Sequence, residues 1–140
     1  MTATSLRTEH FSIGADIDVN IAVVKTGKLE LTAGFPAPER SSIATVVSEL
    51  GRNISKYAGR GSIRLGRVED EQRQGIEVTA EDRGPGIPDL EHAMQDHVST
   101  GGTLGLGLPG VRRMMDEFEI ESQPGKGTRV TARKWMKKAR

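Results

Sequence analysis

The sequence predicts a two-layer α/β sandwich, with a mixed, mostly antiparallel sheet and helices on one of its faces. Three observations support this fold class. The chain has 140 residues, which is enough for one hydrophobic core and suggests a single domain, residues 1–140. Three segments repeat apolar residues at helical spacing, and several shorter segments alternate apolar and polar residues as half-buried strands do.

The chain is expected to begin with a short strand at 9–13, followed by a helix. Asp16 is a suitable residue to cap the start of this helix. The segment 34–39, which contains Gly and Pro, should break it. The apolar residues at helical spacing are Ile17, Ile21 and Val24.

The most regular helix of the sequence follows, and the glycines of 58–61 end it. Its apolar residues keep to positions i, i+3 and i+4, which indicates one buried face. The residues of this stripe are Ile43, Val46, Val47, Leu50, Ile54 and Tyr57.

Two strands are predicted next, at 62–68 and 76–82, because both segments alternate apolar and polar residues. The charged segment between them is expected to be a hairpin loop. Gly and Pro crowd the residues after the second strand, which favours irregular backbone. A short helix is expected within 89–99.

The last part of the chain predicts one more helix and a closing β-hairpin. Pro109 suits the first turn of the helix. The hairpin strands are predicted at 117–123 and 128–136, on either side of the turn sequence Pro-Gly-Lys-Gly. The residues at helical spacing in the helix are Val111, Met114, Met115 and Phe118.

The composition excludes several classes of protein. The chain has no cysteine, which rules out disulfides, thiolate metal sites and a cysteine nucleophile. Its formal net charge of +1 gives no general attraction to nucleic acid or to an anionic membrane, so neither is expected as a partner. The N-terminal segment lacks the apolar core of a signal peptide, and no apolar run approaches the ~18 residues of a membrane span. A cytoplasmic protein is therefore expected.

The stretch TGGTLGLGLPGV, residues 100–111, contains the spacing G-x-G-x-x-G at Gly105, Gly107 and Gly110. In dinucleotide-binding folds this spacing directly follows a strand, and the residues before Gly105 do not read as one. A protein-kinase glycine loop would need V-A-I-K, H-R-D and D-F-G segments, and a Walker A loop would need a lysine after its last glycine; the sequence lacks them. Two interpretations remain, a loop that binds phosphate at a helix N-terminus and a flexible surface loop.

A polar face borders the apolar stripe of the 43–57 helix. Glu49 and Asn53 are four residues apart and Lys56 follows three residues later, so the three side chains share one side of the helix. An Asn oxygen suits a hard cation such as Mg²⁺ that bridges phosphates, and a carboxylate one turn away could orient or deprotonate a nucleophile. The alternative is an ordinary solvated helix face with an incidental Asn.

The pattern Asp82-x-Gly84-x-Gly86 falls at the end of the second strand of the central pair. A carboxylate accepts from an exocyclic amine, so Asp82 could select adenine over guanine. The two glycines would let the backbone pass close to a flat ligand. Alone, the pattern is a weak signal, and an Asp-Gly turn would also explain it.

In combination and in this order, these segments resemble the GHKL, or Bergerat, ATP-binding superfamily. ELGRN at 49–53 is similar to its N box, and DRGPGI at 82–87 to its first glycine box. TGGTLGLGL at 100–108 is similar to its second glycine box, and GKGT at 125–128 to the element before its last strand. The resemblance covers about residues 40–135, and it implies that the ligand is ATP.

Within the superfamily, the chain resembles the RsbT-type switch kinases, which belong with the anti-sigma serine/threonine kinases of bacterial stress regulation. The segments 48–59 and 103–122 carry this narrower resemblance. It implies ATP- and Mg²⁺-dependent phosphorylation of serine or threonine on STAS-domain antagonist proteins, including stressosome scaffold proteins. The freed kinase would then bind and activate a PPM-type phosphatase.

The resemblance also implies roles for individual residues. Asn53 would coordinate Mg²⁺, and Asp82 would accept from the adenine amine, helped by Thr128 through a water. Glu49 would be the catalytic residue that orients or receives the proton of the substrate hydroxyl, and 88–104 would form a lid. The implied ATP-binding residues are Arg52, Asn53, Lys56, Asp82, Gly84, Gly86, Ile87, Gly101, Gly102, Thr103, Leu104, Gly105, Leu106, Gly107, Leu108 and Thr128.

Two other functions fit the same motifs. An anti-sigma factor would hold a sigma factor by direct binding, and an interaction module would bind ATP without catalysing a reaction. The presence of both Glu49 and Asn53 argues against a purely non-catalytic module.

Overall fold

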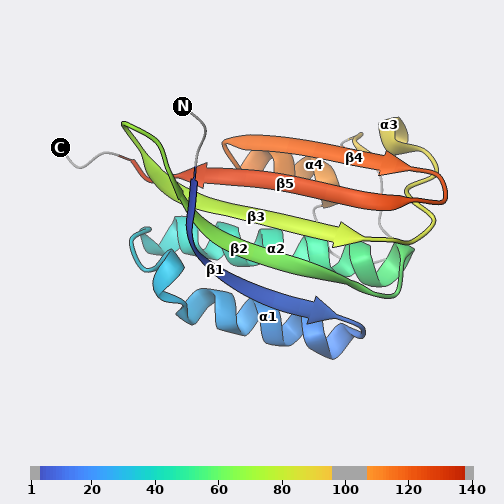
Figure 1. Ribbon diagram of the computed structural model, residues 1–140, viewed down its shortest axis with the longest axis horizontal. Coiled ribbons are helices and arrows are strands. Elements are labelled where there is room, and N and C mark those ends of the chain that lie inside the picture. Colours follow the sequence, from blue (N-terminus) through green and yellow to red (C-terminus); the bar gives the residue numbers. More distant parts are fainter. Residues whose placement is uncertain (1–3, 96–106, 138–140) are drawn as a thin grey trace.

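The computed structural model describes residues 4–95 and 107–137, and its helices and strands follow the predicted order (Figure 1). The strands are β1 (Thr4–Ile13), β2 (Gly61–Glu69), β3 (Gln74–Asp82), β4 (Glu117–Gln123) and β5 (Gly127–Trp135). The helices are α1 (Asp16–Lys28), α2 (Ala37–Tyr57), α3 (Leu90–Ala93) and α4 (Gly107–Met114), with a short 3-10 helix at Glu30–Thr32.

The five strands form one sheet in the order β1-β2-β3-β5-β4. All four neighbouring pairs are antiparallel, which confirms the predicted fold class and leaves no parallel pair in the described sheet. Figure 1 shows α2 and α4 behind the sheet, whereas its near face is left open by the described helices. Within the described residues, no helix is both long and apolar enough to cross a membrane.

The core lies between α2 and the sheet, as the stripe of this helix predicts. Ile43, Val46, Val47, Leu50 and Ile54 are buried, and Tyr57 is partly buried against them. The sheet contributes the side chains of one face, which are Ile63, Leu65, Ile76, Val78, Ala80, Val130 and Ala132. This packing holds the last turns of α2 beside the end of β3.

The prediction for α1 is wrong about which side of the helix is buried. Ile17, Ile21 and Val24 are exposed, at 61%, 44% and 57% of their surface. The buried residues of α1 are Val19, Ala22 and Thr26.

The reason lies in the close contact between α1 and α2. A Cβ atom on Gly51 of α2 would lie 2.8 Å from Val19 Cγ1, so the two helices approach where one of them has no side chain. Thr26 satisfies its buried hydroxyl by donating to the Ala22 carbonyl at 2.7 Å. Two helices can approach this closely only where the residues at their contact are small. The side of α1 with the smaller residues therefore faces α2.

We expect the substitution Ile21→Lys to change the free energy of unfolding by less than about 0.5 kcal/mol, because the side chain is exposed. Val19→Ala, two positions away, should cost at least about 1 kcal/mol, since it removes buried methyl groups. Urea denaturation of the two variants measures both values. A similar loss for both would show that Ile21 belongs to the core.

The start of α1 also differs from its prediction. The helix is preceded by Ala15, and Asp16 is its first residue instead of its cap. The capping carboxylate is that of Asp18, which accepts from the backbone N–H groups of Gly14 at 2.8 Å and Ala15 at 3.1 Å. Asp16 instead accepts from the Ser55 hydroxyl of α2 at 2.8 Å, which ties the two helices together.

The predicted extent of α4 is wrong at its C-terminal end. The helix ends at Met114, and Phe118 lies in β4. Pairing with β5 explains this, because the Asp116 N–H already donates to the Arg133 carbonyl at 2.8 Å. Pro109 lies in the first turn of the helix, as predicted.

Candidate functional site

The candidate site lies where the ends of β3, β5 and α2 meet the start of α4. Residues from these elements and from the loop after β3 enclose a small cavity. Its volume is about 10 Å³, so the side chains fill the space almost completely. The lining residues are Leu50, Asn53, Tyr57, Ala80, Asp82, Ile87, Leu108, Thr128 and Val130.

Asp82 and Thr128 lie side by side on neighbouring strands, and both line this cavity. They are paired residues of the β3–β5 ladder, although 46 positions separate them in the chain. Asp82 Oδ1 accepts from the Gly84 N–H at 3.0 Å, which fixes the carboxylate at the strand end. Within residues 4–95 and 107–137 its second oxygen accepts no hydrogen bond, so it could accept from a donor such as an exocyclic amine.

Close backbone contacts hold the glycine-rich loop after β3 in place. A Cβ atom on Gly84 would lie 2.5 Å from Ala58 Cβ at the end of α2. Gly86 has a φ of +85°, and a Cβ there would lie 2.6 Å from the Gln123 carbonyl oxygen. Glycine at these two positions therefore lets the loop fit between α2 and β4. Ile87, next in the loop, is buried and lines the cavity.

Ser122 is a residue of this site that the sequence analysis missed. Its hydroxyl oxygen accepts from the Ile87 N–H at 2.8 Å and lies 2.8 Å from Thr128 Oγ1. A signal was present in the sequence, because the alternation Phe118, Ile120, Ser122 places a polar residue on the inward face of β4.

Asn53 contributes the most unusual polar group of the cavity. Its Nδ2 atom is buried and has no hydrogen-bond partner among the residues that the structure describes. Such a group in a folded protein costs on the order of 1–3 kcal/mol. A ligand that pairs with the Asn53 amide would offset this cost.

Glu49 lies one turn before Asn53 and points toward α4. Only 6% of its surface is exposed, and its Oε2 accepts from the Gly107 N–H, the first residue of α4, at 3.2 Å. The carboxylate also lies 3.7 Å from Nη1 of Arg52. A carboxylate is favoured here because helix N-termini attract negative charge.

The two basic residues predicted for ATP binding differ in position. Arg52 is half-exposed but lies beside Glu49 at the edge of the site. Lys56 is exposed, with its Nζ 5.3 Å from the centre of the Tyr57 ring. The structure therefore does not bring Lys56 into the cavity.

Part of the second glycine box lies outside the described residues. This applies to Gly101, Gly102, Thr103, Leu104, Gly105 and Leu106, and to most of the lid predicted at 88–104. Gly107 and Leu108 are described. Both are buried at the start of α4, and Leu108 lines the cavity.

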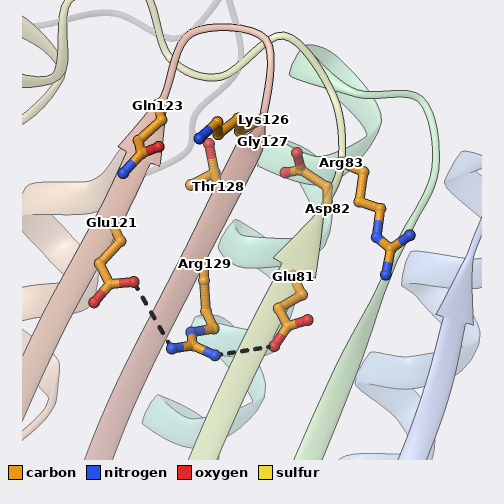
Figure 2. Close-up of a pocket in the computed structure, with 9 residues that line it drawn as sticks. All are labelled: Glu81, Asp82, Arg83, Glu121, Gln123, Lys126, Gly127, Thr128 and Arg129. Carbon is orange, nitrogen blue, oxygen red and sulfur yellow. Dashed lines mark ion pairs between the residues drawn. The ribbon is translucent and has the colours of Figure 1, made fainter.

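A second, larger hollow also borders Asp82, on the sheet face away from α2 (Figure 2). Its volume is about 350 Å³, and it is open to solvent and strongly charged. Arg129 lies between Glu81 and Glu121 there, at 3.6 and 3.7 Å, so its charge is already balanced by two carboxylates. The apolar walls that a base needs are found in the smaller cavity, lined by Ile87 and Leu108.

Comparisons with known proteins show the family to which the chain belongs. The chain belongs to the histidine kinase-, DNA gyrase B- and HSP90-like ATPase family, whose model matches residues 39–138. A Mycobacterial sensor histidine kinase, MprB, shares the fold with a TM-score of 0.50 and 21% identity, over 69% of this chain and 71% of that one. ATP is therefore the nucleotide of this family of domains.

Two relatives place the chain within the family. It is 49% identical to the serine/threonine-protein kinase RsbT of Bacillus subtilis (strain 168) over 104 residues, which are 74% of this chain and 78% of that protein. It is 38% identical to the anti-sigma F factor of Thermoanaerobacter sp. (strain X514) over 104 residues, 70% of this chain and 71% of the relative. The resemblance to the RsbT-type serine/threonine kinases and their anti-sigma relatives is thus confirmed.

Proposed function

We propose that this protein transfers the γ-phosphoryl group of ATP to a serine or threonine of a protein partner. The observation that carries the proposal is the cavity that joins Asn53, Asp82 and Thr128, in a chain 49% identical to a named serine/threonine kinase. Its partners would be STAS-domain antagonist and stressosome scaffold proteins. The released kinase would bind a PPM-type phosphatase.

The edge of the adenine ring would lie against the neighbouring side chains of Asp82 and Thr128. A space of about 10 Å³ holds no more than one water molecule, so the walls must separate when the base binds. The Asp82 carboxylate would accept from the base amine, and Ile87 and Leu108 would cover its faces. The phosphates would then extend toward α4, whose first N–H groups favour anions.

Asn53 is the residue that would hold Mg²⁺. Among residues 4–95 and 107–137, no three His, Cys, Asp or Glu side chains are grouped to bind a metal ion. An ion would therefore need phosphate oxygens together with the side-chain oxygen of Asn53, since the oxygen of an amide, and not its N–H₂ group, is the atom that binds Mg²⁺. When bound, Mg²⁺ would neutralise charge on the phosphates.

Glu49 would receive the proton of the attacking hydroxyl. The substrate oxygen forms a bond to the γ-phosphorus as the bond to the bridging oxygen breaks, and ADP leaves. A carboxylate offers about four lone-pair positions, so Glu49 can accept this proton while it still accepts from Gly107.

We expect Glu49→Gln to lower the rate of phosphoryl transfer by about 100-fold or more, because the amide cannot act as a base. The amide oxygen can still accept from Gly107, so the melting temperature and ATP affinity should change little. Glu49→Ala removes that bond too and should lower the melting temperature. Single-turnover kinetics, calorimetry and thermal melts separate these effects. A joint fall in ATP affinity and stability for Glu49→Gln would make Glu49 structural.

The proposal is tested by incubating the protein with γ-labelled ATP, Mg²⁺ and purified STAS-domain antagonist proteins. Label on a serine or threonine of a STAS-domain protein supports the kinase function. Tight ATP binding without any transfer to these proteins contradicts it.

Direct binding of a sigma factor is the second candidate function, because several relatives are named anti-sigma F factors. A pull-down with the purified protein distinguishes the two. Recovery of a sigma factor as the main partner would favour the anti-sigma function, and recovery of a phosphatase or STAS-domain proteins would favour the switch kinase.

A further inference from the structure

Helix α1 exposes three large apolar side chains to solvent, and we propose that they form the contact surface of a homodimer. Two copies of the chain would pair their α1 helices in antiparallel directions across a two-fold axis. The surface lies outside the nucleotide site, so this inference goes beyond the proposed kinase function and does not depend on it.

The exposed side chains of Ile17, Ile21 and Val24 form one continuous stripe along α1. They are four and three residues apart, which is the spacing of an apolar seam between two paired helices. The buried side of the helix is the opposite one, so the stripe points away from α2. Single apolar residues on a surface need no explanation, whereas a contiguous group of them indicates an interaction site.

The charges beside the stripe favour a second copy of the same helix as the partner. Asp18 and Lys25 are seven residues apart, so they lie on the same flank of the stripe. In an antiparallel pair with Ile21 on the two-fold axis, each Asp18 lies beside the second copy's Lys25, and each Ile17 lies beside the second copy's Val24. Parallel pairing would place like charges together, which is unfavourable.

The edge of the molecule that carries α1 leaves room for a second copy. Figure 1 shows α1 and β1 together at this edge, and β1 pairs with β2 alone among the described strands. The cavity is enclosed by other elements, namely α2, β3, β5, α4 and the loop after β3. Both nucleotide sites would therefore stay open in the dimer.

The size of the surface sets the strength of the dimer. Stable protein interfaces bury about 800 Å² on each partner. The α1 helix has 13 residues, which is roughly 20 Å of helix with one apolar stripe. We therefore expect a weak dimer, with a dissociation constant on the order of 10 μM or above.

Sedimentation equilibrium over a wide range of protein concentration tests the association. The mass should rise from that of one chain toward that of two. Ile21→Lys places two ammonium groups at the axis and should weaken the association at least about tenfold. At low concentration this variant should melt like the wild type, because the stripe is exposed in the single chain. Ser41→Lys, at an exposed position of α2, is the matched control and should associate like the wild type.

Single cysteine variants report the direction of the two helices, because the chain has no cysteine of its own. A disulfide needs Cα atoms within about 7 Å of each other. Under mild oxidation Ile21→Cys should link to itself, since this position lies on the axis. Ile17→Cys alone should not, because antiparallel helices separate its two copies by roughly 12 Å along the axis. A mixture of Ile17→Cys and Val24→Cys should link.

The outcomes are distinct from those that test the kinase function, because none of these measurements uses nucleotide. A chain that stays monomeric at all concentrations overturns the proposal, and a STAS-domain protein or sigma factor that binds through Ile21 would then be the partner of the stripe. A dimer that persists in Ile21→Lys overturns it as well, since the contact would lie elsewhere. Linking of Ile17→Cys alone, as fast as Ile21→Cys, contradicts the antiparallel arrangement.

Discussion

Replacement of Asp82 by Asn is expected to weaken ATP binding by about 100-fold or more, because a site built to pair with a polar group strongly rejects a mismatch. The structure explains why such a small change should have so large an effect. Asp82 Oδ1 accepts from Gly84, so the Asn oxygen would remain on that bond and its amide nitrogen would face the base. Two donors would then meet, the Asn amide and the adenine amine. Calorimetric titration with ATP measures the loss.

The neighbouring substitution Glu81→Gln provides the control. Glu81 points to the open face of the sheet and pairs with Arg129 at 3.6 Å (Figure 2). Replacement of Glu81 should leave ATP affinity unchanged if the base binds against Asp82 and Thr128 in the small cavity. Normal ATP binding by Asp82→Asn together with weak binding by Glu81→Gln would contradict this placement. It would show that the nucleotide binds in the larger hollow, on the sheet face away from α2.

Replacement of Asn53 by Ala is expected to reduce Mg²⁺-dependent phosphoryl transfer by about 100-fold or more, because charge neutralisation at the phosphates dominates this chemistry. The same variant should be at least as stable as the wild type. It removes a buried amide nitrogen that has no partner among the described residues, and Ala is the better helix former. Single-turnover transfer assays and thermal melts measure the two effects.

A titration with Mg²⁺ shows whether Asn53 acts through the metal ion. Nucleotide affinity without Mg²⁺ should be similar in wild type and Asn53→Ala, and only the wild type should gain affinity when Mg²⁺ is added. Unchanged kinase activity in Asn53→Ala would exclude the metal role, and a large fall in melting temperature would show that Asn53 supports the fold.

Much of the fold could be predicted from the sequence, because α2 and the inner strands have strong local patterns. The α2 stripe from Ile43 to Ile54 is buried as its spacing indicates, and Asp82 lies at the end of β3 as the alternation of that strand indicates. Local periodicity reports which side chains share a face. It also placed Glu49 and Asn53 on the side of α2 that borders the cavity and α4.

The α1 helix shows where periodicity becomes ambiguous. It carries apolar residues on two sides, and the larger ones, Ile17, Ile21 and Val24, gave the stronger pattern although they are exposed. The buried side was decided by Gly51, a residue of another helix that leaves room for Val19. No pattern within α1 contains that information.

Contacts between distant segments explain the other residues that the sequence did not reveal. Glu49 and Gly107 are 58 positions apart, and Ser122 meets Ile87 across 35 positions. Such contacts depend on strand order and helix docking, which spacing along one segment does not encode. The motifs could name Asp82, Asn53 and Thr128 as parts of one site through resemblance, but the supporting role of Ser122 required the geometry.

A crystal structure with a non-hydrolysable ATP analogue and Mg²⁺ would show whether ATP binds in the cavity between α2 and the sheet. We predict that the adenine amine lies within hydrogen-bond distance of Asp82, the base edge faces Thr128, and the metal ion contacts Asn53. A base bound instead in the hollow on the open face of the sheet, against Glu81 and Arg129, would show that the cavity is not the nucleotide site.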